Sequence, residues 1–328
     1  MSVTTKDLAR ICNVSRTSIV RALNDQKGIS DATRQMILDK AKELGYRTDM
    51  LAKGLVQGKT MYIGVVVFDV RNRYFAQMLS AIENEAKTKD YFVNITLHEK
   101  NKEKERELIQ RLLDYRVDGL ILSPVSKDQE FADFLKTIEV PYIVIGNKVS
   151  DDIPYVGIDE KKAALEATIK IARKDYERIV FVCPPLGDAQ KENVYSHQQR
   201  AKGFQEAMKA YPQIEPVIIQ SWDYVDEAVK ILDSSDKKTA FFCSGDEFAL
   251  DILKTMRANK KRAPRDYGIM GFDNIDTLDY IEPKLFTTDN AVEEVGKKAV
   301  QLLFQLLDGE KIPNKSMVAY TAIDGETL

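Results

Sequence analysis

A basic and polar helix face near the N-terminus has residue types that can bind a polyanion. Ser15 can cap a helix, and the apolar residues that follow it recur at helical spacing: Ile19, Ala22 and Leu23. The opposite face points outward and carries Arg16, Thr17, Val20, Arg21 and Asn24. An arginine can bond guanine bidentately, and a threonine offers a hydroxyl and a methyl group to either type of base pair.

The charge of the chain is unevenly distributed, and the excess of positive charge lies in the segment that contains this basic helix face. Residues 1–60 carry 11 Lys and Arg against 6 Asp and Glu, a net charge of +5, and the other residues together carry −8. A small basic segment on a larger acidic body is expected when the segment binds a polyanion and the body has another task. The alternative is chance variation in composition.

Three short helices must position the basic face. Thr4 with Asp7 three residues later predicts the start of a first helix, and its apolar residues share one face: Leu8 and Ile11. A turn at 13–14 and the helix after Ser15 follow. A third helix is expected between Ser30 and Gly45, with these buried residues: Ile37, Ala41 and Leu44. This spacing predicts an all-α helix-turn-helix domain over residues 1–48.

The order of the residues carries more information than their spacing. The segments VTTKDLARICNVSRTSIVRALN and ISDATRQMILDKAKELGYRTDMLAKGLVQGKT resemble the N-terminal part of the lactose-repressor/galactose-repressor (LacI/GalR) family of bacterial transcription regulators. The resemblance implies that the second helix lies in the major groove of a pseudo-palindromic double-stranded DNA operator. The DNA-binding residues implied for this domain are Thr4, Ser15, Arg16, Thr17, Arg21 and Asn24. The family has a serine where this chain has Val20, so either a phosphate contact is missing or Val20 touches a thymine methyl group.

Residues 49–60 correspond to the hinge helix and linker of that family. The resemblance implies that Leu55 wedges into the minor groove at the centre of the operator and kinks the DNA. An alternative is an interdomain linker with a buried leucine. A segment this short would not be helical alone, so pairing with a dimer mate and DNA must support it.

From residue 61 the pattern changes to apolar strands that alternate with helices. Strands are expected over 61–68, 91–97, 118–123, 141–146, 178–183, 216–220, 239–244 and 267–272, with helices over 74–90, 103–115, 128–138, 197–210, 224–233 and 246–258. Two such sets predict an α/β body of two doubly wound parallel-sheet subdomains. The resemblance adds a periplasmic-binding-protein-like fold for residues 61–328, an effector-binding and dimerisation domain. Its first subdomain covers about 61–160 and 290–320, and its second covers about 161–289 and the C-terminal end.

Open α/β sheets bind ligands at the carboxyl ends of their strands, which here carry Asp246 and Asp273. The family resemblance adds further effector-binding residues: Asn72, Tyr74, Phe75, Arg200 and Tyr224. Carboxylates, an arginine and aromatic faces suit a polyhydroxylated ligand. Three alternatives remain open: Arg200 and Asp273 pair with each other, Asp246 caps its helix, and Phe75 belongs to the core. Arg71 and Arg73 leave room for a phosphorylated or acidic ligand.

Several function classes lack their signatures. Neither GxGxxG after the first strand, nor GxxxxGK[ST], nor GxSxG occurs, and two histidines in unrelated contexts offer few candidates for acid-base chemistry. We expect no catalytic residue, no metal site and no cofactor. The three cysteines, which have no CxxC spacing, are expected to be buried thiols. Neither an apolar 18-residue run nor an apolar N-terminal segment occurs, which predicts a cytoplasmic protein without membrane contact.

The sequence therefore predicts a DNA-binding transcriptional repressor, controlled by a sugar or sugar-phosphate effector between the two body subdomains. No leucine heptads follow residue 322, which predicts a homodimer. Three alternatives stay open: a regulator controlled by a protein co-repressor, a sugar-binding protein without a DNA role, and an enzyme. The charged run NKEKERELIQR is expected to be the solvated start of a helix.

Overall fold

The computed structural model describes residues 3–47, 54, 58–187 and 192–328. By its contacts the chain divides into two compact units, Met1–Thr60 and Met61–Leu328. Most of the hinge segment expected over 49–60 lies outside the described residues, and so does Leu55. Within the described residues, no helix is both long enough and apolar enough to cross a membrane.

The first unit contains three helices, which are α1 (Thr5–Ile11), α2 (Arg16–Leu23) and α3 (Asp31–Glu43). The predicted caps all form, because the hydroxyls of Thr4, Ser15 and Ser30 each accept a backbone N–H in the first turn of their helix. Their core consists of Leu8, Ala9, Ile19, Ala22, Ile37 and Ala41. Ile11 departs from the expectation, since it is 43% exposed at the end of its helix.

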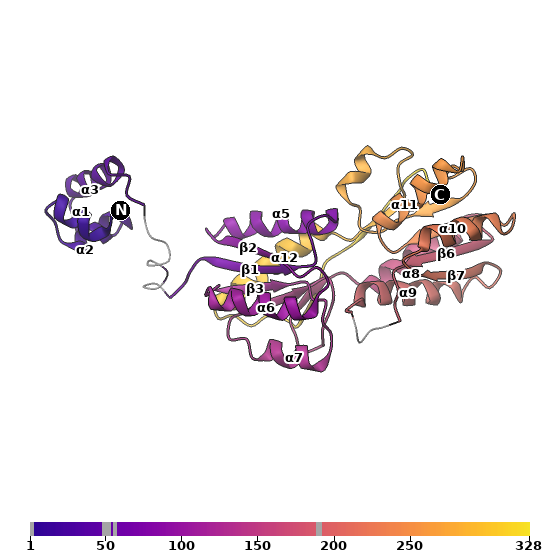
Figure 1. Ribbon diagram of the computed structural model, residues 1–328, viewed down its shortest axis with the longest axis horizontal. Coiled ribbons are helices and arrows are strands. Elements are labelled where there is room, and N and C mark those ends of the chain that lie inside the picture. The colour runs from indigo at the N-terminus through magenta and orange to yellow at the C-terminus, as the bar shows by residue number, and fades with distance from the viewer. Residues whose placement is uncertain (1–2, 48–53, 55–57, 188–191) are drawn as a thin grey trace. The chain divides into compact units, whose positions relative to one another are not determined.

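The first subdomain of the body is built on a six-stranded parallel sheet with the order β11-β5-β4-β3-β1-β2 (Figure 1). Its strands are β1 (Tyr62–Val67), β2 (Phe92–Leu97), β3 (Gly119–Leu122), β4 (Tyr142–Ile145), β5 (Tyr155–Gly157) and β11 (Lys315–Met317). One face packs against α5 (Arg73–Lys87) and α12 (Val292–Leu307), and the other against α6 (Lys102–Asp114) and α7 (Gln129–Lys136). Both faces are therefore covered, as the continuous apolar strands predict.

The second subdomain repeats this plan with a four-stranded parallel sheet of order β7-β6-β8-β9. Its strands are β6 (Arg178–Cys183), β7 (Glu215–Gln220), β8 (Thr239–Cys243) and β9 (Gly268–Met270). One face packs against α8 (Glu160–Ala172) and α9 (Tyr195–Met208), and the other against α10 (Tyr224–Asp233) and α11 (Asp246–Ala258). The predicted fold class, a helix-turn-helix domain with two doubly wound subdomains, is confirmed.

The chain passes between the two subdomains at three places. It leaves the first sheet after β5 to form α8, and it returns after β10 (Thr287–Asp289) to form α12. It crosses again after β11 to form β12 (Thr321–Ile323), which pairs antiparallel with β10. Figure 1 shows these crossing segments beside one another between the two sheets. Each subdomain therefore contains chain from both sides of a crossing.

Two expectations about single residues need correction. Cys183 and Cys243 are buried, but Cys12 is partly exposed at the end of α1. The charged run at the start of α6 is not wholly solvated either, because Glu105 is only 1% exposed. Its carboxylate accepts the backbone N–H groups of Val125 and Ser126 at 2.9 and 3.0 Å. Glu105 therefore lies in a charged run that is typical of a solvated surface, yet it is buried and holds the loop after β3 by two hydrogen bonds.

Candidate functional site

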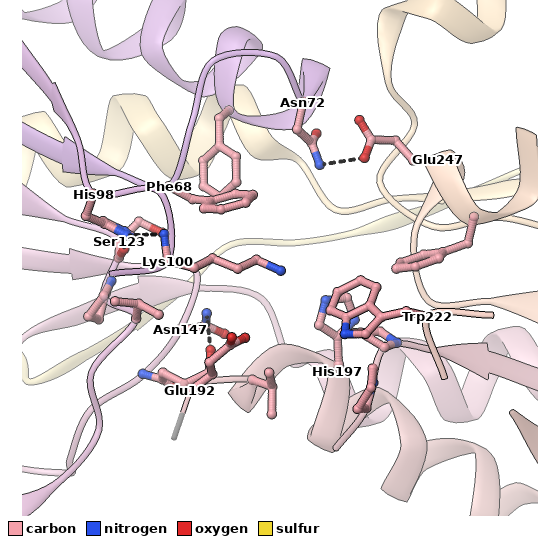
Figure 2. A pocket seen from close by; sticks show the side chains of 18 of the residues that line it. Phe68, Asn72, His98, Lys100, Ser123, Asn147, Glu192, His197, Trp222 and Glu247 are labelled. Carbon is pink, nitrogen blue, oxygen red and sulfur yellow. Dashed lines mark hydrogen bonds between the residues drawn. The ribbon is translucent and has the colours of Figure 1, made fainter. Parts of the chain in front are cut away.

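A cavity of about 420 Å³ lies between the two subdomains at the carboxyl ends of their strands (Figure 2). From the first subdomain its wall contains Phe68, His98, Ser123 and Asn147, which follow β1, β2, β3 and β4. From the second it contains Pro184, Trp222 and Glu247, which follow β6, β7 and β8. The volume falls within the roughly 300–1,000 Å³ of small-molecule sites. The strand-end rule for open α/β sheets thus places a binding cleft here.

A smaller cavity of about 120 Å³ continues this cleft inward. The two cavities share the wall residues Asn72, Phe75, Ser123, Asn147 and His197. The inner cavity adds Tyr74, Arg200 and Asp273. Six of the seven predicted effector residues therefore line one of the two cavities: Asn72, Tyr74, Phe75, Arg200, Tyr224 and Asp273.

The start of α5 places three of these residues. The Asn72 Oδ1 atom accepts the backbone N–H of Tyr74 at 2.9 Å and caps the helix, while its Nδ2 donates to Glu247 across the cleft at 3.1 Å. The rings of Tyr74 and Phe75 meet edge to face at 5.1 Å. Phe75 lines both cavities and also packs against the core of the first subdomain. Both interpretations of Phe75 therefore describe part of its surroundings.

Arg200 is 4% exposed and already has charged partners. Its Nε donates to Glu160 at 2.7 Å, and its Nη1 donates to Asp273 at 3.2 Å and to the backbone oxygen of Ser244 at 2.6 Å. Burial raises the pKa of Asp273 well above its ordinary value, although Arg200 acts in the opposite direction. The pairing of Arg200 with Asp273 therefore exists within the cleft wall, and Arg200 is shared between Asp273 and Glu160.

Asp246 lies behind the wall. It is fully buried and belongs to neither cavity. Its carboxylate accepts the hydroxyl of Thr287 at 2.6 Å and the backbone N–H of Ile275 at 3.0 Å. Burial raises the pKa of Asp246 to about 7. Its side chain does not cap α11 but ties the loop after β9 to β10, and so supports Asp273.

Aromatic rings from the second subdomain form the outer wall. Tyr224 packs edge to face on Phe248 at 5.0 Å and donates its hydroxyl to Asp251. Trp222 is more than half exposed at the mouth of the cavity. His197 lies against Phe248 and its ring hydrogen-bonds the Ser244 hydroxyl at 3.1 Å. Burial lowers the pKa of His197 to about 3, so this ring is neutral at physiological pH.

Sequence reasoning missed several residues of the cleft: His98, Lys100, Asn147, Asn193 and His197. The strand-end rule could have found two of them, since His98 directly follows β2 and Asn147 follows β4 within two residues. Asn193 carried no signal, because its role depends on the first subdomain. Its backbone N–H donates to the oxygen of Val125 at 2.7 Å, which closes one side of the cleft.

The helical face of the first unit has the predicted arrangement. Arg16 and Thr17 are exposed at the start of α2, and Val20 is also exposed. Arg21 is partly buried because its Nη1 donates to the oxygen of Gly28 at 3.2 Å. Gly28 has φ +104°, and a Cβ there would lie 2.9 Å from that nitrogen. The loop after α2 thus holds Arg21 in place at the edge of the basic face.

Three further predicted residues serve as caps of this unit. The Thr4 hydroxyl accepts the Asp7 backbone N–H, and the Asp7 carboxylate accepts the Thr4 backbone N–H at 3.1 Å, which completes a capping box. The Ser15 hydroxyl accepts the backbone N–H of Ser18 at 3.1 Å. Asn24 ends α2, and its side-chain amide donates to the oxygen of Val20 at 3.0 Å. These side chains have structural partners within the unit in addition to any role at a ligand.

Comparison with known proteins decides the family. Residues 4–49 match the model described as bacterial regulatory proteins, lacI family, and residues 170–328 match the periplasmic binding protein-like domain. The chain belongs to the LacI family. Like its LacI-family relatives, which are regulators and not enzymes, it is a DNA-binding transcriptional regulator. The prediction that the chain is not an enzyme is thereby confirmed.

Relatives of this LacI-family member extend over nearly its whole length. It is 29% identical to catabolite control protein A of Priestia megaterium over 95% of both chains. It is 27% identical to the HTH-type transcriptional repressor CytR of Escherichia coli (strain K12), over 96% of this chain and 93% of that one. The lac repressor dimer bound to operator and the anti-inducer ONPF has the same fold, with a TM-score of 0.86, 21% identity and coverage of 100% and 99%.

Proposed function

We propose that this regulator is a repressor that binds a pseudo-palindromic operator as a homodimer and responds to a small carbohydrate bound between its two body subdomains. The observation that carries the proposal is the composition of the cleft wall. Aromatic rings, Phe75, Trp222 and Tyr224 among them, lie beside hydrogen-bonding side chains. Rings pack on the aliphatic face of a sugar, while amides and carboxylates bond its hydroxyls. A solved structure with a similar fold is the complex of the transcriptional regulator CelR with cellobiose.

The DNA contacts follow from the first turn of α2. Arg16 and Thr17 are exposed there, at a helix end whose free N–H groups also favour phosphate. We assign base contacts to Arg16, Thr17 and Arg21, and backbone contacts to Thr4, Ser15 and Asn24. Leu55, in the hinge assigned to residues 49–60, acts as the wedge in the minor groove. Each of these residues is one for which the family resemblance implied contact with DNA.

A homodimer is supported by the exposed edge of the first subdomain. Strand β2 forms one edge of the six-stranded sheet, and two of its apolar side chains face solvent: Phe92 is 59% exposed and Ile95 is 43% exposed. Exposed apolar edge strands are normally avoided because they pair or aggregate. A second copy of the chain covers this strand, and the two-fold axis that results matches a palindromic operator.

Coupling between the two ligands requires a two-state element. Closure of the cleft around a carbohydrate shifts the first subdomains of a dimer relative to each other and changes the spacing of the two hinges. Effector and operator then alter each other's affinity by the same factor, typically about 1–3 kcal/mol of coupling free energy. Leu55→Ala should weaken operator binding and leave effector affinity in the DNA-free protein unchanged.

The test has two stages. Operator sites are selected from a random DNA library with the full-length protein, and ligands are found by thermal shift with neutral sugars, sugar phosphates and sugar acids. The effector found is then titrated by calorimetry with and without operator. Palindromic sites and an effector affinity that changes on operator binding support the proposal. An identical effector affinity in both titrations contradicts it, because no coupling then exists.

A further inference from the structure

Lys100 extends a cationic side chain into the cleft from the first subdomain (Figure 2). It lies in the turn after β2, where Glu99 and Lys100 have φ values of +51° and +62°. Two successive non-glycine residues in the left-handed region are uncommon and unfavourable, and such backbone concentrates at functional sites. The turn is therefore held by its surroundings in a conformation that directs Lys100 at the cavity.

A buried histidine supplies that support. The Nδ1 atom of His98 accepts the backbone N–H of Lys100 at 3.2 Å, and its Nε2 lies 3.0 Å from the backbone oxygen of Ser123. Because Nδ1 accepts, the proton is on Nε2 and the ring is neutral. Burial lowers the pKa of His98, which agrees with that state. The Glu99 N–H adds a bond of 3.0 Å to the oxygen of Phe68.

The ammonium group of Lys100 lies between two aromatic rings. Its Nζ is 5.0 Å from the ring centroid of Phe68, on the first subdomain, and 4.5 Å from that of Trp222, on the second. Ring faces attract a cation but do not neutralise it. Within the part of the chain that the structure describes, Lys100 forms no ion pair with a carboxylate. Glu192 lines the same cavity but lies beyond ion-pair distance, so the cleft presents a positive charge that no described carboxylate pairs with directly.

Two arginines and two carboxylates of the region already have partners, whereas Glu192 also lines the cavity and has no ion pair among the described residues. Arg73 pairs with Asp276 outside the cavities, and Arg71 is 88% exposed near Asp69. These two arginines, which the sequence offered for an acidic ligand, line neither cavity. Two carboxylates of the wall lie on α11 and accept neutral donors: Glu247 from Asn72, and Asp251 from Tyr224. The carboxylates on α11 can therefore accept hydroxyl groups of a ligand, and Lys100, on the His98 side, can bind an anion.

We propose that Lys100 selects a carbohydrate that carries an oxyanion, either a phosphate or a carboxylate group. This inference rests on the proposed function, because it names the ligand class of the same cleft. An ammonium group is a compact point charge with three donors, which suits a phosphate or carboxylate oxygen. The anion lies beside Lys100 and between the two subdomains, so it also adds an attraction that favours the closed cleft.

The single tryptophan of the chain, Trp222, gives a direct readout in the full-length protein. It contacts Lys100, so a ligand that moves the ammonium group changes its fluorescence. Matched probes separate the sources of the anion: glucose, glucose 6-phosphate and glucuronate form one series, and ribose with ribose 5-phosphate forms another. The series is extended by the neutral and charged forms of any sugar found in the thermal-shift screen.

Two variants and one control test the role of Lys100 itself. Lys100→Ala should weaken binding of the anionic sugar about tenfold or more, and Lys100→Arg should restore most of the affinity. Lys89→Ala is the matched control, because Lys89 also lies over a ring, that of Phe304 at 4.7 Å, but outside the cavity. It removes the same charge and should leave affinity unchanged.

The outcomes separate this inference from the proposed function. An anionic sugar that binds through Lys100 supports both, and the preferred probe shows whether phosphate or carboxylate is the anion. A neutral sugar that binds better than its charged forms overturns the inference and leaves the proposed function intact. An anionic sugar whose affinity is the same in Lys100→Ala also overturns it. If no probe of any class binds, the proposed function fails and the inference fails with it.

Discussion

Asn147 donates its side-chain Nδ2 to the backbone oxygen of Asn193 over 2.7 Å, and this bond joins the end of β4 to the segment before α9. The other half of the same amide accepts twice from Ser196, from its N–H at 3.2 Å and from its hydroxyl at 3.0 Å. One side chain of the first subdomain thus forms three hydrogen bonds to the second. Asn147 also lines both cavities, so the side chain that joins the two subdomains is one that a bound ligand would contact.

Asn147→Ala should shift the body towards an open cleft. Each of the three lost hydrogen bonds contributes about 0.5–1.5 kcal/mol, so the change is expected to favour opening by about 1.5–4.5 kcal/mol and to weaken effector binding. Small-angle scattering of the effector-free and effector-bound protein measures the opening. Asn259→Ala, at the exposed end of α11, serves as control. Equal scattering curves for wild type and Asn147→Ala would show that this residue does not hold the cleft closed.

Arg200→Ala should lower the free energy of unfolding of the body by about 3–5 kcal/mol, because it leaves Glu160 and Asp273 buried without their cation. Loss of effector response in this variant would therefore not identify a ligand contact. Urea unfolding followed by circular dichroism measures the loss. Arg173→Ala, exposed at the end of α8, should cost little. A loss for Arg200→Ala no larger than that of Arg173→Ala contradicts the prediction.

Glu105 should make the body less stable as the pH rises. Burial raises the pKa of its carboxyl to about 7, although the N–H groups of Ser126 and Val125 act in the opposite direction. From about pH 4.5 to 7 the folded protein keeps a proton that the unfolded chain has lost. Stability therefore falls across this window, by about 3 kcal/mol for this group.

The variant Glu105→Gln should remove this part of the pH dependence, although it loses one acceptor for the loop after β3. Urea unfolding at pH 5 and pH 8 gives the two free energies for each protein. Glu103→Gln, exposed on the same helix, should retain the slope of the wild type. Asp246 contributes a slope of the same sign to all three proteins, so only the difference between them matters. Parallel slopes for wild type and Glu105→Gln would refute the assignment.

Arg21→Ala should weaken operator binding by about 1–3 kcal/mol and relax the preference at one symmetric base pair. The loss on random DNA should be much smaller, because a base contact carries the effect. Fluorescence anisotropy with operator and random duplexes at equal salt concentration measures both. Lys40→Ala, which removes a cation paired with Glu43 on α3, is the control. Equal losses on both duplexes would mean that Arg21 contacts only phosphate.

Local chemistry made much of this molecule predictable. Caps such as Ser15 and Ser30 depend on a hydroxyl and the next turn of helix, and both formed as expected. The continuous apolar strands predicted both parallel sheets, because strands with both faces covered are apolar along their whole length. Helix α12 was not predicted, yet its buried Val295, Ala299 and Leu302 follow helical spacing and could have revealed it. Helix α8 is harder, because it is rich in alanine and lacks a clear polar face.

The part of the site that could not be predicted depends on contacts between distant segments. Lys100 directly precedes the charged run that is typical of a solvated surface, and only the turn held by His98 directs it into the cleft. Glu105 belongs to that run, but the loop after β3 buries it. Asp246 follows its strand like Asp273, yet only Asp273 lines a cavity. Position after a strand therefore predicts the neighbourhood of a side chain and not its direction.

The crossings between the subdomains also set an order in which the protein can be completed during synthesis. The first unit contains only local helical contacts, so it can fold as soon as it leaves the ribosome. The first subdomain cannot, because α12 and β11 belong to its sheet layers and are made last. Residue 292 follows residue 47 by about 245 positions, or about 12–50 s of translation at about 5–20 residues per second. The three helices of the first unit are thus formed well before the body of the chain is complete.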